Sequence, residues 1–306
     1  MKILVTGGAG FIGSHLVRQL MDAGDEAISL DNLSTGLREN LPKEARLEVM
    51  DIHDDRVEDL FRREHFDGVV HLAGQTLVSS SIEDPKNDMF QNIDGTVRIL
   101  ECCRKYGVPR VIFSSSAAVY GDVEEKDLPI TEDHSAEPLS FYGLTKLTVE
   151  KYLALYHRIF GIHYMALRFA NVYGERQGDG GEGGVISIFA KRLAEGKDIT
   201  IFGDGKQTRD FVYTGDIARG IRKALTTENC DTCCNLSTET ETSLNDLTAT
   251  FSTITGTPVT PKYGPAREGD IYRSSLSNRK AKDLLDWKPE VPLEEGLKRT
   301  YEYFRK

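Results

Sequence analysis

The sequence predicts an α/β protein: a doubly wound parallel sheet with a smaller, mixed α/β domain towards the C-terminus. Three observations support this fold class. An apolar strand at residues 2–6 leads into a glycine-rich turn and then into an amphipathic helix. Apolar strands and amphipathic helices continue to alternate through the first 170 residues, as in βαβ proteins. After Tyr173 glycine, charged and turn residues become frequent, which indicates a second structural unit.

The first strand and turn have the features of a dinucleotide-binding loop. Gly7, Gly10 and Gly13 permit a tight turn and let the backbone approach a pyrophosphate, which the start of the next helix would face. A second strand at residues 27–30 ends in Asp31, about 20 positions beyond the glycines, where a carboxylate accepts hydrogen bonds from ribose hydroxyls. Because this charge repels the additional phosphate of NADP, we predict a Rossmann-type domain that binds NAD.

Further strand and helix signals follow in the order that this fold requires. Strands are predicted at residues 47–50, 68–74 (with a turn), 110–113 and 164–169, and helices at residues 92–106 and 142–160. Ligands bind outside the carboxyl ends of the strands in such sheets. The strand at residues 110–113 therefore delivers Ser114, Ser115 and Ser116 to the ligand edge. His71, inside a buried strand, is expected to be a hydrogen-bonded core residue.

The second unit begins with a glycine-rich loop at residues 175–184, followed by an apolar helix at residues 185–193. Arg209 follows a polar turn and enters a strand, and Arg267 lies on another polar turn. Arginines on turns are usually solvated, but two that converge would form a fork-like clamp for a diphosphate.

The composition excludes several classes of protein. A net charge of −10 argues against nucleic-acid binding, and no apolar run is long enough to cross a bilayer. The first strand starts at residue 2 and leaves no room for a signal peptide, so we expect a cytoplasmic protein.

Five cysteines remain, of which Cys230, Cys233 and Cys234 form a C-x-x-C-C run. A metal or redox site is one interpretation of this run. However, no histidine or fourth thiol stands at ligand spacing, and residues 235–237 continue the run like a strand. We therefore expect small buried residues and no metal site.

Tyr142 and Lys146 are separated by one helical turn, so their side chains share a helical face. A free phenol has a pKa of about 10 and is a poor base at neutral pH. At roughly 6.5 Å and an effective dielectric constant of about 20, an ammonium stabilises a phenolate by about 2.5 kcal/mol, near two pKa units. The pair therefore predicts a phenol that acts as a base, although the same spacing also occurs on ordinary solvated helices.

Eight short segments spread along the chain match one known family in combination. They are TGGAGFIG at 6–13, HLAG at 71–74, NIDGT at 92–96, FSSSAAVYG at 113–121, YGLTK at 142–146, RFANVYG at 168–174, GDGKQTRDFVY at 203–213 and REGD at 267–270. With these segments the chain resembles the NAD-dependent epimerase/dehydratase family, the extended short-chain dehydrogenases. The resemblance covers essentially the whole chain and is greatest to UDP-glucose 4-epimerases.

The resemblance implies a role for each matching position. It implies that Ser116 binds the 4-hydroxyl of the sugar, that Tyr142 is the base and acid, and that Lys146 holds the nicotinamide ribose. The implied NAD contacts are Gly7, Gly10, Phe11, Ile12, Gly13, Asp31, Asn32, Asp51, Ile52, Leu72, Ala73, Gly74, Asn92, Ser114, Tyr142 and Lys146. The implied contacts to the UDP-sugar are Ser116, Tyr142, Asn171, Arg209, Arg267, Asp270 and Ser274.

The implied activity is UDP-sugar 4-epimerisation, in which NAD transiently oxidises carbon 4 and returns the hydride to the other face of the sugar. UDP-glucose and UDP-galactose are the implied pair, and the small side chain of Ser274 leaves room for the N-acetylated pair as well. Ala117 and Ala118 replace the acids that dehydratases carry after the catalytic serine or threonine, so dehydration is disfavoured. Thr76 replaces a lysine of some epimerases and puts one nicotinamide contact in doubt.

Two alternatives remain open from the sequence. One is a UDP-uronate 4-epimerase or another nucleotide-sugar oxidoreductase of the same family. The other is an NAD- or nucleotide-binding regulatory protein, which would not need an intact Ser116, Tyr142 and Lys146.

The resemblance also implies an assembly and a division of the chain. It implies a homodimer formed by the helices at residues 92–106 and 142–160. It divides the chain into an NAD-binding domain and a nucleotide-sugar-binding domain. The first comprises residues 1–170 and 214–238, and the second residues 171–213 and 239–306.

Overall fold

A parallel sheet with helices on both faces forms the larger lobe of the protein. The computed structural model describes residues 1–178, 184–266 and 271–306. The strands of this sheet are β1 (Lys2–Thr6), β2 (Glu26–Asp31), β3 (Arg46–Val49), β4 (Gly68–His71), β5 (Arg110–Ser116), β6 (His163–Phe169) and β10 (Thr232–Leu236). They lie in the order β10-β6-β5-β4-β1-β2-β3, and every neighbouring pair is parallel. The order reverses at β1, which confirms the predicted Rossmann-type fold.

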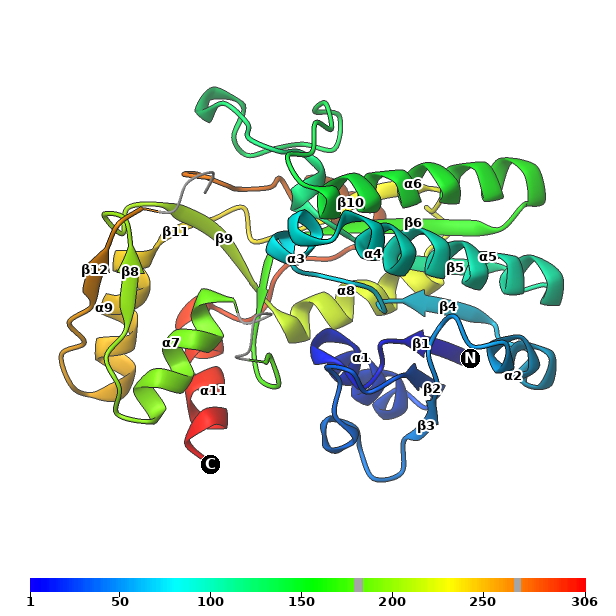
Figure 1. Cartoon of the computed structure of the whole chain (residues 1–306), viewed down its shortest axis with the longest axis horizontal. Coiled ribbons are helices and arrows are strands. Elements are labelled where there is room, and N and C mark those ends of the chain that lie inside the picture. Colours follow the sequence, from blue (N-terminus) through cyan, green and yellow to red (C-terminus); the bar gives the residue numbers. More distant parts are fainter. Residues whose placement is uncertain (179–183, 267–270) are drawn as a thin grey trace.

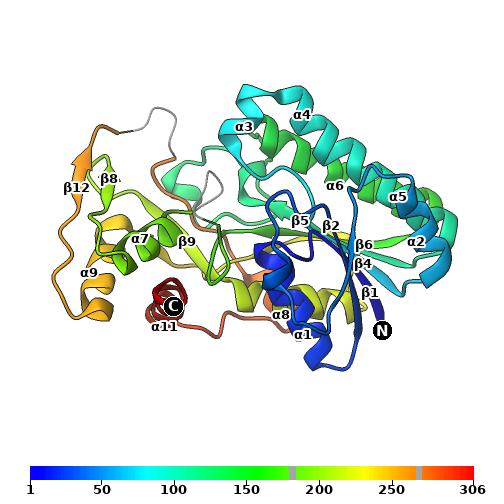
Figure 2. The same cartoon turned by 60° about the horizontal axis from the view of Figure 1, so that its bottom comes forward.

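Helices cover both faces of this sheet and bury two separate apolar cores (Figures 1 and 2). One face carries α1 (Phe11–Asp22) and α8 (Thr214–Thr226), which pack against each other. The other face carries α2 (Arg56–Glu64), α5 (Gly95–Tyr106) and α6 (Phe141–Phe160). Because both faces are covered, the central strands β1 and β4 are buried almost throughout their length and are mostly apolar, as the sequence pattern predicts.

Local signals set the bounds of the helices near the ligand edge. The Ser140 hydroxyl accepts a hydrogen bond from the Gly143 amide and starts α6, and Gly161 ends the helix with a φ of 73°. The helix predicted at residues 92–106 differs from the observed one. A π-helical turn, η2 (Phe90–Asp94), precedes α5 and follows α3 (Val78–Glu83) and α4 (Pro85–Met89).

The smaller lobe is mixed α/β and lies beyond the ligand edge of the large sheet, at the left of Figures 1 and 2. Its strands are β7 (Asn171–Tyr173), β9 (Thr208–Tyr213) and β11 (Glu241–Ser243) in one sheet, and β8 (Thr200–Phe202) and β12 (Lys262–Gly264) in another. Its helices are α7 (Val185–Ala194), α9 (Leu244–Thr255) and α11 (Leu293–Arg305), which share a third apolar core. Short 3₁₀ turns connect other elements: η1 (Arg38–Asn40), η3 (Ala117–Val119) and η4 (Glu125–Asp127).

The end of the chain contributes to both lobes. Helix α10 (Arg279–Leu285) contacts β10 and α8, and Ala281, Leu285 and Trp287 belong to the same apolar core as β1 and α1. The predicted domain division therefore stays a prediction, with this segment packed against the larger lobe. No helix in the described part of the chain is long and apolar enough to span a membrane.

His71 occupies the core position that the sequence predicts. Its side chain is fully buried on β4, with Nδ1 2.7 Å from Thr6 Oγ1 and Nε2 3.0 Å from Thr96 Oγ1. Burial lowers its pKa to about 3, so the ring stays neutral and hydrogen-bonded.

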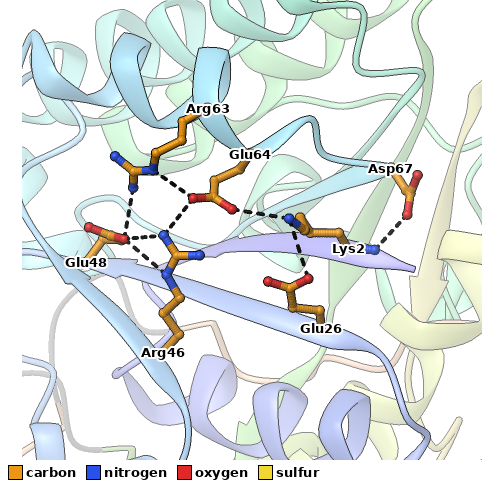
Figure 3. Close-up of polar contacts among 7 residues, drawn as sticks. All are labelled: Lys2, Glu26, Arg46, Glu48, Arg63, Glu64 and Asp67. Atoms are coloured by element: carbon orange, nitrogen blue, oxygen red, sulfur yellow. Dashed lines mark hydrogen bonds and ion pairs between the residues drawn. The ribbon is translucent and has the colours of Figure 1, made fainter.

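A cluster of charged side chains ties the amino ends of β1, β2 and β3 to α2 (Figure 3). Glu64 of α2 is its centre, because its nearly buried carboxylate meets Arg46 at 2.7 Å, Arg63 at 2.8 Å and Lys2 at 3.2 Å. The hydrogen bond from Arg46, followed by that from Arg63, holds the pKa of Glu64 at about 2. This cluster lies at the opposite end of the strands from the ligand edge.

We expect Glu64→Gln to lower the free energy of unfolding by on the order of 1 kcal/mol at pH 7, a modest value because Arg46 and Arg63 face solvent. The folded-state pKa is depressed. The contribution is therefore complete above pH ~4.5 and disappears as the pH falls towards about 2. Urea unfolding at pH 7 and pH 3.5 measures the difference. Glu26→Gln, at the solvent-exposed end of the cluster, is the control and should change little. An equal deficit for Glu64→Gln at both pH values would contradict the electrostatic explanation.

Candidate active site

A large cavity lies between the two lobes at the carboxyl ends of the central strands. Its volume is about 1150 Å³. The turn after β1 and the ends of β2, β4 and β5 line one side, and α7, β8 and β9 line the other. This volume exceeds the roughly 300–1,000 Å³ typical of a pocket for one drug-sized ligand, so the cavity has room for two ligands.

Close backbone contacts form the glycine turn at the bottom of the cavity. Gly7 has a φ of 68°, and a Cβ atom there would lie 2.9 Å from the Ala73 nitrogen in the loop after β4. A Cβ atom on Gly13 would lie 2.1 Å from the Gly7 oxygen, so this position admits only glycine. Helix α1 begins after Gly10 with no side-chain cap, which leaves its first amides available to an anion in the cavity.

Asp31 ends β2 at the edge of the same turn. Its carboxylate accepts hydrogen bonds from the Ala9 amide at 2.9 Å and the Leu33 amide at 2.8 Å, which fix its orientation. Burial raises the pKa of Asp31 above its ordinary value, and these backbone amides oppose that rise. Beside it, Asn32 donates a 2.7 Å hydrogen bond to Asp51, so three predicted NAD contacts form one polar rim.

Ser116, Tyr142 and Lys146 converge on the floor of the cavity. Ser116 is the last residue of β5, and its hydroxyl is near enough to the Tyr142 phenol to lower the pKa of that phenol. Lys146 is almost fully buried, with Nζ 2.9 Å from the Ser114 oxygen and 5.7 Å from the centroid of the Tyr142 ring. The structure thus brings together the three residues that the sequence singles out for chemistry.

The predicted lowering of the Tyr142 pKa by Lys146 alone is wrong for this arrangement. Burial raises the pKa of Tyr142, the hydrogen bond from Ser116 opposes the rise, and the charge of Asp88 adds to it. Burial also lowers the pKa of Lys146 to about 8. The reason is that Lys146 is buried and Tyr142 is half-buried on the cavity floor, so the cost of desolvating a charge exceeds the attraction that the sequence argument considered.

A buried polar network that the sequence argument missed lies behind Tyr142 and Lys146. Asp88 of α4 is fully buried and accepts hydrogen bonds from Gln75 Nε2 at 2.7 Å, Thr145 Oγ1 at 3.0 Å and Asn92 Nδ2 at 3.1 Å. Thr145 Oγ1 also lies 2.9 Å from the Tyr142 carbonyl oxygen, an alternative acceptor for the same hydroxyl proton. The network therefore links the loop after β4 and the π-helical turn to the first turn of α6. Asp88 stands four positions before Asn92, and this helical spacing was the available signal in the sequence.

Most of the predicted site residues line the cavity. These are Gly7, Gly10, Phe11, Ile12, Gly13, Asp31, Asn32, Asp51, Ile52, Leu72, Ala73, Gly74, Ser114, Ser116, Tyr142, Lys146, Asn171 and Arg209. Asn92 lies behind the wall, where its Oδ1 accepts a 2.8 Å hydrogen bond from the Gln75 amide. Ser274 is described but is not one of the residues that line this cavity.

Two predicted substrate contacts cannot be placed. Arg267 and Asp270 lie outside the described residues, as do residues 179–183 of the predicted loop. The predicted clamp of Arg209 and Arg267 therefore stays a prediction. Arg192 of α7 lines the small-lobe side of the cavity and was missed, because nothing in its helical sequence distinguishes it from a surface arginine.

Comparison with known proteins gives the family. Residues 3–233 match the sequence model of the NAD-dependent epimerase/dehydratase family. The chain belongs to this family. It is 38% identical over 311 residues to a UDP-glucose 4-epimerase of Mycolicibacterium smegmatis, which covers all of this chain and 99% of that protein.

Solved structures of family members share the whole fold. The crystal structure of UDP-glucose 4-epimerase from Thermotoga maritima with UDP-glucose has a TM-score of 0.96 and 43% identity, covering 100% of this chain and 99% of that one. The Thermus thermophilus UDP-glucose 4-epimerase in complex with NAD has a TM-score of 0.93 and 38% identity, with the same coverage. Both lobes of the family fold are therefore present in this chain.

Two substitutions in the glycine turn should have different effects on stability and on NAD binding. Gly13→Ala should lower the free energy of unfolding by about 1–3 kcal/mol, because its Cβ atom meets backbone that cannot move aside. Gly10→Ala should cost less, since its nearest contact is at 3.1 Å, yet it should still weaken NAD binding because it faces the cavity. Urea unfolding without nucleotide and NAD titration measure the two effects. Equal stability losses in both variants would contradict the assignment of Gly13 as the close-packed position.

Proposed function

We propose that the protein is a UDP-glucose 4-epimerase that uses NAD. The observation that carries the proposal is the convergence of Ser116, Tyr142 and Lys146 on the floor of a cavity that also contains the glycine turn and Asp31. The family membership and the names of the relatives support the same activity.

The residues on the large-lobe side of the cavity fit a dinucleotide. The uncapped start of α1 offers amide donors for a pyrophosphate, and the oriented carboxylate of Asp31 offers acceptors for ribose hydroxyls. The same carboxylate disfavours the additional phosphate of NADP. When bound, NAD supplies a reversible hydride acceptor for carbon 4 of the sugar.

The floor residues move and hold the proton. Ser116 lies beside Tyr142 and can form a hydrogen bond with the 4-hydroxyl of the sugar. The Tyr142 phenol accepts the proton of that hydroxyl and later returns it. Lys146 orients the ribose beside the phenol and adds positive charge. Because burial raises the pKa of Tyr142, Lys146 does not suffice to produce a phenolate, and the positive nicotinamide ring provides the remaining stabilisation.

The small-lobe side offers groups suited to a nucleoside diphosphate. Asn171 at the start of β7 and the guanidinium groups of Arg192 and Arg209 line this part of the cavity. Arginines match the bidentate geometry of phosphate oxygens. We assign these residues to the UDP portion of the substrate, which anchors the molecule while the sugar ring turns over. We also propose a cytoplasmic location, as the sequence leads us to expect.

The substrate range is tested directly. Purified protein is incubated separately with UDP-glucose, UDP-N-acetylglucosamine and UDP-glucuronate, and the epimers are resolved by chromatography. We expect UDP-glucose and UDP-galactose to interconvert. Turnover of UDP-glucuronate alone would instead establish a uronate epimerase, and turnover of none would leave the regulatory alternative.

We expect Tyr142→Phe to reduce kcat for epimerisation at least about a hundredfold, the usual loss when a general acid/base is removed. NAD binding should persist, because Phe keeps the ring and only the hydroxyl is lost. Tyr156→Phe is a matched control on the same helix, since its hydroxyl bonds Glu101 at 2.7 Å far from the cavity. If the Tyr142→Phe variant kept near-normal turnover, Tyr142 would not be the acid/base group.

We propose that two copies associate through α5 and α6 in a four-helix bundle. Along α6, four exposed apolar side chains are spaced by eight, three and four residues, which places them on one face of the helix: Leu144, Tyr152, Leu155 and Ile159. This stripe faces away from the sheet, and a monomer would leave it in water. The proposal therefore follows from apolar surface that the fold itself does not cover.

Leu155→Glu should shift the protein from a dimer to a monomer, because a carboxylate on each copy would be buried in the interface without a partner. Light scattering at micromolar concentration distinguishes the 34.2 kDa chain from a species of twice that mass. Val49→Glu, at an exposed apolar residue on the edge strand β3, is the control and should remain dimeric. A wild-type protein that scatters as a single chain would refute the interface.

A further inference from the structure

A cluster of metal-binding side chains lies at the end of α6 that points away from the cavity. His157 belongs to the last turn of α6, His163 is the first residue of β6, and Asp231 directly precedes β10. One ligand atom from each of these three residues lies within 4.8 Å of the other two. The cluster is 15 positions along α6 from Tyr142, or about 22 Å at the helical rise. It is therefore separate from the candidate active site.

The donor atoms converge on the carboxylate of Asp231. His157 Nδ1 lies 3.2 Å from Asp231 Oδ1, and His163 Nδ1 lies 2.9 Å from Asp231 Oδ2. Cys230 Sγ is not one of these three mutually close atoms but is a candidate fourth donor, 3.3 Å from Asp231 Oδ2 and 3.5 Å from His163 Nδ1. Tetrahedral zinc with bonds of about 2.0–2.3 Å separates its ligand atoms by roughly 3.3–3.8 Å. Small rotations of these side chains would therefore open the cluster around one ion.

The backbone holds the key carboxylate in place. The Tyr164 amide donates to Asp231 Oδ1 at 3.0 Å, and Asp231 itself has a φ of 66°, a conformation uncommon for a residue with a side chain. Arg110 donates to Cys230 Sγ at 3.8 Å and orients the thiol from behind. Contacts of this kind, which orient the ligands from behind, typically accompany metal sites.

Hydrogen bonding within the cluster does not satisfy all of its members. His163 is hydrogen-bonded to Asp231, which by itself would describe an ordinary surface network. His157 Nδ1 differs, because this atom is buried and makes no hydrogen bond despite its closeness to the carboxylate. A cation among these atoms would provide the partner that His157 Nδ1 lacks.

We propose that His157, His163, Asp231 and Cys230 form a structural binding site for a zinc-type divalent ion. Two imidazoles, one thiolate and one carboxylate are a donor set that zinc prefers, and they complete a four-coordinate site without an open position. The ion would join the end of α6 and the adjoining start of β6 to the start of β10, where Asp231 lies 68 positions beyond His163. The site neither contributes to the proposed epimerase reaction nor depends on it.

The test uses the full chain after removal of metal with EDTA. Cobalt(II) serves as the probe, because a bound thiolate gives a charge-transfer absorption band, and zinc affinity follows from competition against cobalt. We expect one equivalent to bind with that band. His163→Ala and His157→Ala should each weaken zinc binding at least about a hundredfold. Zinc should raise the melting temperature of the wild type but not of these variants, with NAD-dependent turnover unchanged.

Cysteine variants supply the matched comparison. Cys230→Ser should abolish the charge-transfer band, whereas Cys233→Ser, three positions later in the same run, should keep both the band and the affinity. Circular dichroism of the metal-free proteins checks that each variant folds; the two histidines are partly exposed and should tolerate replacement. No stoichiometric binding by the wild type, or unchanged affinity in both histidine variants, would overturn the site. A band that persists in Cys230→Ser would exclude this thiol as a ligand.

Discussion

The buried ammonium of Lys146 is the constraint around which the candidate active site is arranged. A charge removed from water needs partners, and Lys146 has a carbonyl oxygen at 2.9 Å and the face of Phe113 at 4.8 Å. The carboxylate of Asp88 further favours the charged form. These partners come from β5 and α4. The buried ammonium of Lys146 therefore helps to fix the position of α6 relative to the sheet. The phenol of Tyr142, one turn earlier, is placed by the same packing.

The local signals in the sequence predicted the larger lobe well. The strand, glycine turn and helix at the N-terminus, and the strand that delivers Ser116, are encoded by residues close together in the chain. Local patterns determined these elements because burial on both sheet faces leaves continuous apolar runs. The π-helical turn at Phe90–Asp94 was missed, and its buried Asn92 accepts a hydrogen bond from Gln75 in the loop after β4, a long-range contact that the local sequence does not encode.

The same distinction explains which site features the sequence could not show. Sequence spacing predicted that Tyr142 and Lys146 share a face, but the sign of the tyrosine pKa shift depends on how deeply both groups are buried. The C-x-x-C-C run lacked a histidine partner in sequence, yet the fold brings His163 to Cys230 from 67 positions away. Contacts between residues so far apart in sequence depend on the order of the strands in the sheet, and no local sequence pattern predicts them.

The charged cluster at the amino ends of β1, β2 and β3 lies at the end of the strands remote from the cavity. The amino ends of the strands thus contribute to stability, and their carboxyl ends form the site of the chemistry. Substitutions around Glu64 therefore change the stability of the protein at residues that do not line the cavity. A protein built in this way can adapt to a new growth temperature through one end of its sheet and to a new sugar through the other.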